Sequence, residues 1–142
     1  MIKILYFGNI LSKHGTTPTS IEWLAPELAK EHQIITASSK KHSLLRLVDM
    51  IIIFFRHSKT TKIILFDTYS TLAFFYSLII AVMAAIYNIP YIPILRGGDL
   101  PFRLNNTPTL SRYLFGHAYI NVSPSLYLKK VFDKKEYRVK HI

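Results

Sequence analysis

The sequence of 142 residues predicts one α/β domain, a doubly wound, Rossmann-like fold with a parallel sheet, over residues 1–142. Short runs rich in β-branched and aromatic residues alternate with longer helical runs, which is the pattern of βαβ units. The short runs are almost continuously hydrophobic, as expected for strands covered on both faces. Half of the residues are hydrophobic, and a chain of this length supports one good core. No linker or repeat divides it.

The elements follow from this pattern and from capping residues. Strands are expected at Ile2–Phe7, Gln33–Ala37, Lys62–Phe66, Tyr91–Leu95 and Tyr119–Val122, with a last one at Arg138–Ile142. Helices are expected from Thr19 or Ser20 to about Glu31, from His42 or Ser43 to about Arg56, from Thr68 or Ser70 onward, from Thr107 or Thr109 onward, and from Ser123 or Ser125 to about Phe132. Pro26 should bend or shorten the first helix.

The apolar run Leu72–Ile89 approaches the ~18 residues at which a membrane span must be considered. Asp67-Thr68 precedes it and Asn88-Ile89-Pro90 follows it, as in a capped helix between two strands. These flanks favour a buried crossover helix. A membrane-embedded segment is the alternative.

The chain is strongly basic, with 18 Lys and Arg against 8 Asp and Glu and a formal charge of +10. This charge favours a polyanionic surface, but the basic residues are scattered and do not interleave with aromatic ones, so nucleic acid is not an expected partner. The absence of cysteine excludes disulfides and thiolate metal sites. No pair of the six histidines has a metal-binding spacing, so neither a metal nor a covalently bound cofactor is expected.

Ligands of open α/β sheets bind at the carboxyl ends of the strands, so the loops after the first and fourth strands are the first candidates. The loop from Gly8 to Pro18 has glycines that can take positive φ, and amides at the next helix start can bind an anion. It contains neither a dinucleotide fingerprint nor a Walker loop, and ordinary turn glycines are the alternative. Its candidate binding residues are Gly8, Asn9, His14, Gly15 and Thr16.

The second loop, Leu95–Arg103, has a Gly-Gly pair directly after a buried strand, which should bring its charged residues together. An arginine can clamp a phosphate or carboxylate, and Asp99 is the one candidate catalytic group. The alternative is that Asp99 only pairs with Arg103. The candidate binding residues of this loop are Arg96, Gly97, Gly98, Asp99 and Arg103.

In this order, four segments resemble the N-terminal, acceptor-side domain of retaining GT-B glycosyltransferases of family 4. The segments are the opening strand with its glycine loop, the helix Ile21–Ala29, the stretch Asn88–Asp99 and the stretch Asn121–Lys129. The resemblance implies a nucleotide-sugar donor and hexosyl transfer to a glycan or lipid-linked acceptor. It also implies that the donor-binding C-terminal domain is missing, so that this chain alone is inactive.

Many relatives in that family carry, near the position of Arg96, a histidine that helps to stabilise the reacting sugar. This sequence has arginine there, so that role is not transferred to it. The resemblance further implies a cytoplasmic protein that docks on the inner face of an anionic membrane. The membrane-facing candidates, near the apolar run Met50–Phe55, are Arg46, Arg56, Lys59 and Lys62. A solvated basic face is the alternative for them. The second functional hypothesis is a stand-alone Rossmann-like module that binds a phosphorylated or anionic ligand.

Overall fold

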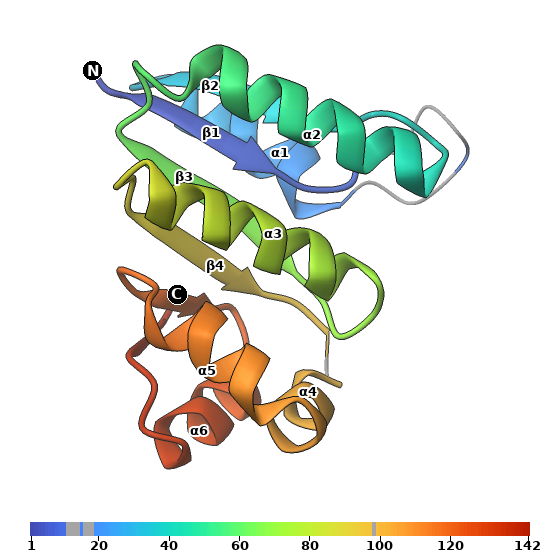
Figure 1. The fold of residues 1–142 in the computed structure, drawn as a ribbon. Helices are drawn as coiled ribbons and strands as arrows, with labels where there is room; N and C mark the ends of the chain where they lie inside the picture. The colour runs from blue at the N-terminus through green and yellow to red at the C-terminus, as the bar shows by residue number, and fades with distance from the viewer. Residues whose placement is uncertain (11–14, 16–18, 98) are drawn as a thin grey trace. The chain divides into compact units, whose positions relative to one another are not determined.

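The computed structural model describes residues 1–10, 15, 19–97 and 99–142, which form an α/β fold (Figure 1). The sheet has six strands in the order β2-β1-β3-β4-β5-β6. The strands are β1 (Lys3–Phe7), β2 (Gln33–Ala37), β3 (Ile63–Thr68), β4 (Tyr91–Leu95), β5 (Asn121–Ser123) and β6 (Val139–His141). The helices are α1 (Ser20–Leu28), α2 (Ser43–His57), α3 (Ala73–Ile86), α4 (Leu100–Asn106), α5 (Pro108–Gly116) and α6 (Leu126–Lys134). The predicted doubly wound fold class is confirmed.

Two compact units make up the chain, Met1–Leu65 and Phe66–Ile142. We call them the first and the second unit, and each is described by itself.

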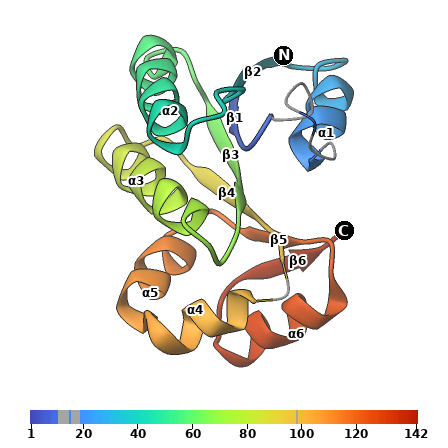
Figure 2. The ribbon, with the colours of Figure 1, turned by 90° about the vertical axis from the view of Figure 1, so that its right-hand side faces the viewer.

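In the first unit, β1 and β2 pair in parallel, with Lys3 opposite Gln33 and Phe7 opposite Ala37. The helices α1 and α2 cover opposite faces of these two strands (Figure 2). Burial on both faces explains the continuous hydrophobicity of β1, in which Leu5 is fully buried.

Helix α1 begins where the capping residues predict. The Thr19 N–H donates to the Glu22 carboxylate at 2.9 Å, and the Thr19 hydroxyl donates to the Asn9 carbonyl at 2.6 Å. The helix ends at Leu28, earlier than the expected end near Glu31. Pro26 lies inside it and has no N–H to donate, which weakens the last turn.

In the second unit, β4, β5 and β6 pair in parallel, with Ile94 opposite Val122 and Asn121 opposite Val139. The apolar run at residues 72–89 forms α3, a crossover helix that buries Phe74, Ile80 and other residues. It has 14 residues, against the ~20 that a bilayer requires. Across the described ranges, no helix is long and apolar enough to span a membrane.

Helix α4 is the element that the sequence did not predict, because its residues were assigned to the loop after the fourth strand. Pro101 lies in its first turn, where the missing N–H costs nothing. Leu100 and Leu104, one helical turn apart, are both buried. The prediction of a loop over these residues is wrong. Proline is typical of loops, but Pro101 lies in the first turn of a short helix.

An aromatic cluster forms the core of the second unit. The ring of Phe115, which is 1% exposed, lies 4.9 Å from the ring of Phe132, 5.8 Å from that of Tyr137 and 6.3 Å from that of Phe74. The pairs with Phe132 and Tyr137 are edge-to-face, and such pairs add to the free energy gained by burying the rings. Phe115 is thus the centre of the packing between α3, α5 and α6.

We expect Phe115→Ala to lower the free energy of unfolding by about 4 kcal/mol, because it leaves a cavity among three aromatic rings. Urea denaturation followed by circular dichroism measures this loss. Phe115→Leu should lose less, on the order of 1 kcal/mol, and remains measurable if the alanine variant does not fold. A similar substitution on the surface, Tyr119→Ala at a side chain 62% exposed, should change little.

Candidate functional site

A pocket of about 350 Å³ lies in the second unit, where strands β3, β4 and β5 end. This is the edge at which open α/β sheets bind ligands. The residues that line it are Tyr69, Leu95, Arg96, Gly97, Pro124, Ser125, Tyr127 and Leu128.

Arg96 is the charged side chain of this pocket. It directly follows β4, and its backbone N–H donates to the Thr68 carbonyl at 2.9 Å, which fixes the start of the loop. Its guanidinium lies close enough to the Tyr69 phenol to lower the pKa of that group. Arginine has five donors and no acceptor, so its guanidinium can donate to an anion.

Tyr69 is held in its neutral form. Burial raises the pKa of its phenol above the usual value of 10.0, the charge of Asp67 adds to the rise, and Arg96 opposes it. A neutral phenol keeps its hydroxyl proton, which Tyr69 can therefore donate to a ligand. Arg96 and Tyr69 therefore offer a ligand both charged and neutral hydrogen-bond donors.

The start of helix α6 forms another wall of the pocket. Ser123 donates its hydroxyl to the Ser125 carbonyl at 2.6 Å, and the Ser125 hydroxyl accepts from the Leu128 N–H at 3.3 Å. The first N–H groups of a helix have no acceptor within the helix. The amides of Leu126 and Tyr127 are therefore donors close to the lining residues of this wall.

Gly97 turns the chain out of β4 with φ at +82°. A Cβ atom there would come no closer than 3.9 Å to Tyr69 Cδ1, so space would permit a side chain. The positive φ is what requires glycine at this position.

The structure separates the other candidates of the second loop from this pocket. Arg103 lies in α4, where its Nε donates to the Ser70 carbonyl at 2.7 Å and its guanidinium stacks 5.0 Å from the ring of Phe75. Asp99 is exposed and immediately precedes α4. Neither lines the pocket. Gly98 lies outside the described residues, and a catalytic role for Asp99 stays a prediction.

The first loop belongs to the first unit, and its beginning extends the pairing of β1 with β2. The Gly8 N–H donates to the Ala37 carbonyl at 2.7 Å, and the Ser38 N–H donates to the Gly8 carbonyl at 2.8 Å. These bonds occupy the backbone groups of Gly8. Asn9 accepts from Thr19, and Gly15 has φ at +87°. His14 and Thr16 lie outside the described residues.

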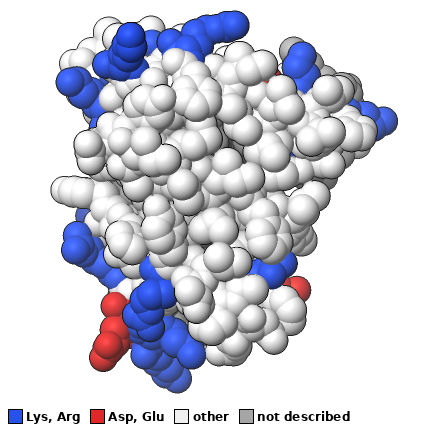
Figure 3. Space-filling model, viewed as in Figure 1, with Lys and Arg blue, Asp and Glu red and all other residues white. Residues whose placement is uncertain are grey.

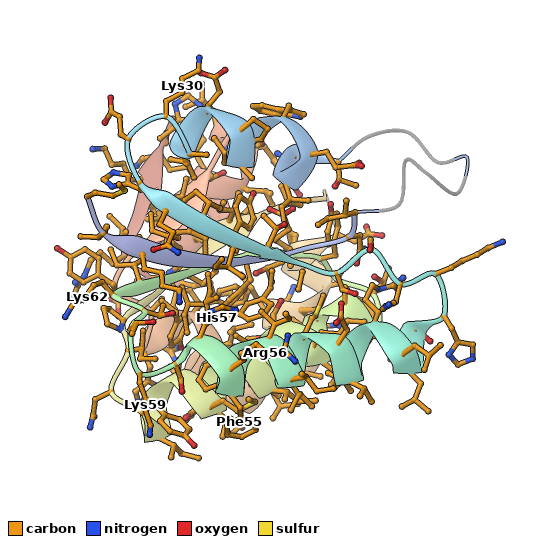
Figure 4. The ribbon with its side chains drawn as sticks, turned by 90° about the horizontal axis from the view of Figure 1, so that it is seen from above. Lys30, Phe55, Arg56, His57, Lys59 and Lys62 are labelled. Atoms are coloured by element: carbon orange, nitrogen blue, oxygen red, sulfur yellow. The ribbon has the colours of Figure 1, made fainter. Side chains whose placement is uncertain are left out.

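The four basic candidates near α2 differ in their surroundings. Lys and Arg appear mostly toward the edges of the face drawn in Figure 3. Arg46 donates from Nη1 to the carbonyls of Lys40 and Lys41, at 3.3 and 3.2 Å. Figure 4 shows Arg56 on α2, and Lys59 and Lys62 in the segment that follows it.

The sequence did not single out Tyr69, Pro124, Ser125 or Tyr127 as site residues. Ser125 carries a usable signal, because a capping serine just after a buried strand marks a helix start at the ligand-binding edge. The described residues contain no group of three or more His, Asp and Glu side chains that could hold a metal ion.

No known protein family matches the sequence, and no curated protein matches it. Among solved structures, the fold is similar to a response regulator receiver domain from Clostridium thermocellum, with a TM-score of 0.55 and 14% identity. The similarity covers 96% of this chain and 98% of that one. At this identity it establishes the fold alone.

The comparison corrects the glycosyltransferase interpretation, which is wrong. A solved structure that the chain resembles over nearly its whole length is a receiver domain and not a GT-B acceptor domain. The partners that this interpretation predicted are wrong as well. They are a missing donor-binding domain, a glycan or lipid-linked acceptor and an anionic membrane surface. The nucleotide-sugar donor stays an untested expectation.

A second polar cluster lies in the first unit, where Lys3 Nζ donates to His57 Nδ1 at 2.7 Å and to Thr60 Oγ1 at 2.9 Å. Burial lowers the pKa of His57 below 6.5, and the charges of Lys3 and Arg56 lower it further. As pH falls below 6.5, the unfolded chain takes up this proton before the folded chain does. The free energy of unfolding therefore decreases as the solution is acidified through this range.

We expect Lys3→Met to raise the pKa of His57 toward its ordinary value, because one of the two cations that repel the imidazolium is removed. NMR titration of the histidine ring signals, assigned with His57→Gln, measures this shift. Lys30→Met removes a lysine that pairs with Glu27 instead, and should leave the pKa of His57 unchanged. Equal shifts in both lysine variants would contradict the local explanation.

We expect Gly97→Ala to lower the free energy of unfolding by about 1 kcal/mol, because alanine is strained at positive φ. Gly116→Ala is the matched control, since Gly116 ends α5 without a positive φ and its Cβ would meet Arg112 Cδ at an ordinary 3.8 Å. The control should be neutral or gain about 0.5 kcal/mol. Urea denaturation of both variants gives the comparison.

Proposed function

We propose that the second unit binds a small molecule with a carboxylate or phosphate group and an apolar or aromatic part, in the pocket formed around Arg96. The single observation that carries this proposal is the convergence of Arg96, the Tyr69 hydroxyl and the start of α6 on one pocket.

The donors favour an anion. The guanidinium of Arg96 supplies a positive charge, and hydrogen bonds from charged donors are about twice as strong as neutral ones. The first amides of α6 add the positive end of the helix dipole. The Tyr69 hydroxyl adds one neutral donor.

The remaining walls favour an apolar group beside the anion. They consist of Leu95, Pro124, Leu128 and the ring of Tyr127. A volume of about 350 Å³ falls at the small end of the range for ligand pockets. Donors and apolar groups dominate this lining, so it supports binding of a ligand without chemical change.

We expect phenyl phosphate, which combines both features, to bind in this pocket. In ¹⁵N-correlated NMR spectra the amide signals of Gly97, Leu126 and Tyr127 should shift with a saturable dependence on its concentration. Arg96→Gln should weaken binding about tenfold, which corresponds to the loss of one charged hydrogen bond of about 1.4 kcal/mol. Benzoate and inorganic phosphate, tested in parallel, separate the contributions of the apolar group and the anion.

Arg138→Gln is the matched control, because Arg138 is an exposed arginine of the same unit that donates to the Tyr119 carbonyl. It removes the same charge and should leave binding unchanged. If the two variants weaken binding equally, or if the shifts lie away from the three named amides, the proposed site is wrong.

A further inference from the structure

Helix α2 of the first unit has an apolar face toward solvent as well as one toward the strands. On its inner face, Met50 and Phe54 are 3% and 0% exposed. On its outer face, five large apolar side chains are between 44% and 62% exposed. We call these five the α2 strip, and they are Leu44, Leu45, Val48, Ile52 and Phe55.

The α2 strip is continuous along the helix. Leu44, Val48, Ile52 and Phe55 follow one another at intervals of four, four and three residues, which places them on one side of a helix. From Leu44 to Phe55 the strip extends about 16 Å, or three turns. Scattered exposed apolar residues are normal, whereas a contiguous stripe marks an interaction surface.

A groove of about 410 Å³ runs along one side of the α2 strip. Its apolar part is formed by Leu45, Val48, Ile52 and Ile53. Two cationic residues, Lys40 and Arg56, and one acidic residue, Asp49, complete its lining. The α2 strip therefore borders an apolar groove that has cationic side chains close to it.

The charges around the α2 strip are mainly positive. Lys40 and Lys41 precede the helix, while Arg56 and Lys59 lie at and beyond its end, and all four are exposed. The one carboxylate of the helix is Asp49, which accepts a hydrogen bond of 2.6 Å from the Ser38 hydroxyl. Over α2, Figure 3 shows a broad area that is neither acidic nor basic, with blue side chains toward its margin. Figure 4 shows Phe55 on the outer side of α2.

We propose that the α2 strip is a docking surface for an acidic amphipathic helix of a partner protein. The apolar stripe of that helix fills the groove, and its carboxylates face the lysines and arginine at the two ends of α2. Helix-in-groove recognition of this kind uses apolar anchors one turn apart, which the spacing of the α2 strip matches. This proposal is independent of ligand binding in the second unit.

Charge decides between this partner and a second copy of the chain. Two copies that met through the α2 strip would bring their lysines and arginines together, with a formal charge of +10 on each. Like charges at an interface oppose association, whereas carboxylates on a partner favour it. The surface therefore suits an acidic helix better than itself.

The test uses the full chain and a fluorescent peptide of roughly four helical turns, with leucines at helical spacing and glutamates elsewhere. Fluorescence anisotropy should show saturable binding that weakens as ionic strength rises. Ile52→Asp should weaken it at least tenfold. Ile86→Asp makes the same change at an isoleucine of α3 that is 70% exposed, and should have no effect. Circular dichroism checks that both variants are folded.

Two further variants separate charge from apolar contact. Arg56→Glu combined with Lys59→Glu should weaken binding about fivefold and reduce its salt dependence. A peptide with lysine in place of every glutamate should bind at least tenfold more weakly than the acidic one.

Several outcomes would overturn the proposal. They are equal affinity for the acidic and lysine peptides, an equal loss of binding in Ile52→Asp and Ile86→Asp, a dimer in sedimentation equilibrium that Ile52→Asp abolishes, and binding to phosphatidylglycerol vesicles without binding to the peptide. Failure here leaves the phenyl phosphate experiment unaffected, because that site lies in the other unit.

Discussion

Strands that are covered on both faces are apolar over most of their length, because a buried polar side chain needs a partner, and much of this structure depends on that constraint. Leu5 in β1 and Leu95 in β4 are almost completely buried, and a polar side chain at either position would need a buried partner. The buried polar residues of β3 and β5 lie at the ends of these strands. Asn121, at the start of β5, donates to the Phe115 and Arg138 carbonyls. Tyr69, Arg96 and Ser125 each follow a strand, and together they form the polar part of one pocket.

The same constraint explains which elements could be predicted. The bounds of β2 and β4 match the sequence prediction. In β4 burial is the reason, because four of its five residues are buried. Helix α2 was also well placed, since its His42 cap accepts from the Leu44 N–H at 3.2 Å as a capping residue should. Helix α4 was missed because a helix of seven residues with a proline in its first turn has too little helical periodicity to be distinguished from a loop.

Only those residues of the candidate site that directly follow a strand in the sequence could be predicted. Arg96 and Gly97 directly follow β4, so their place at the ligand-binding edge follows from the strand. The position of Arg103 depends on packing against Phe74 and Phe75, and Tyr127 joins the pocket through the chain path from β5 to α6. The glycosyltransferase resemblance failed for a related reason. Short, weakly specific motifs in the expected order indicate a shared α/β fold. A shared fold alone does not establish a shared function.

The cations around α2 also affect how fast a partner arrives. A positive field extends about 8 Å from exposed charges at physiological ionic strength, and it orients an acidic molecule before any contact forms. Steering of this kind raises association rates by roughly ten- to a thousandfold. Once the apolar side chains of the α2 strip are covered, they determine how long the complex lasts. The two ends of α2 would thus govern the rate of encounter, and its middle the lifetime of the bound state.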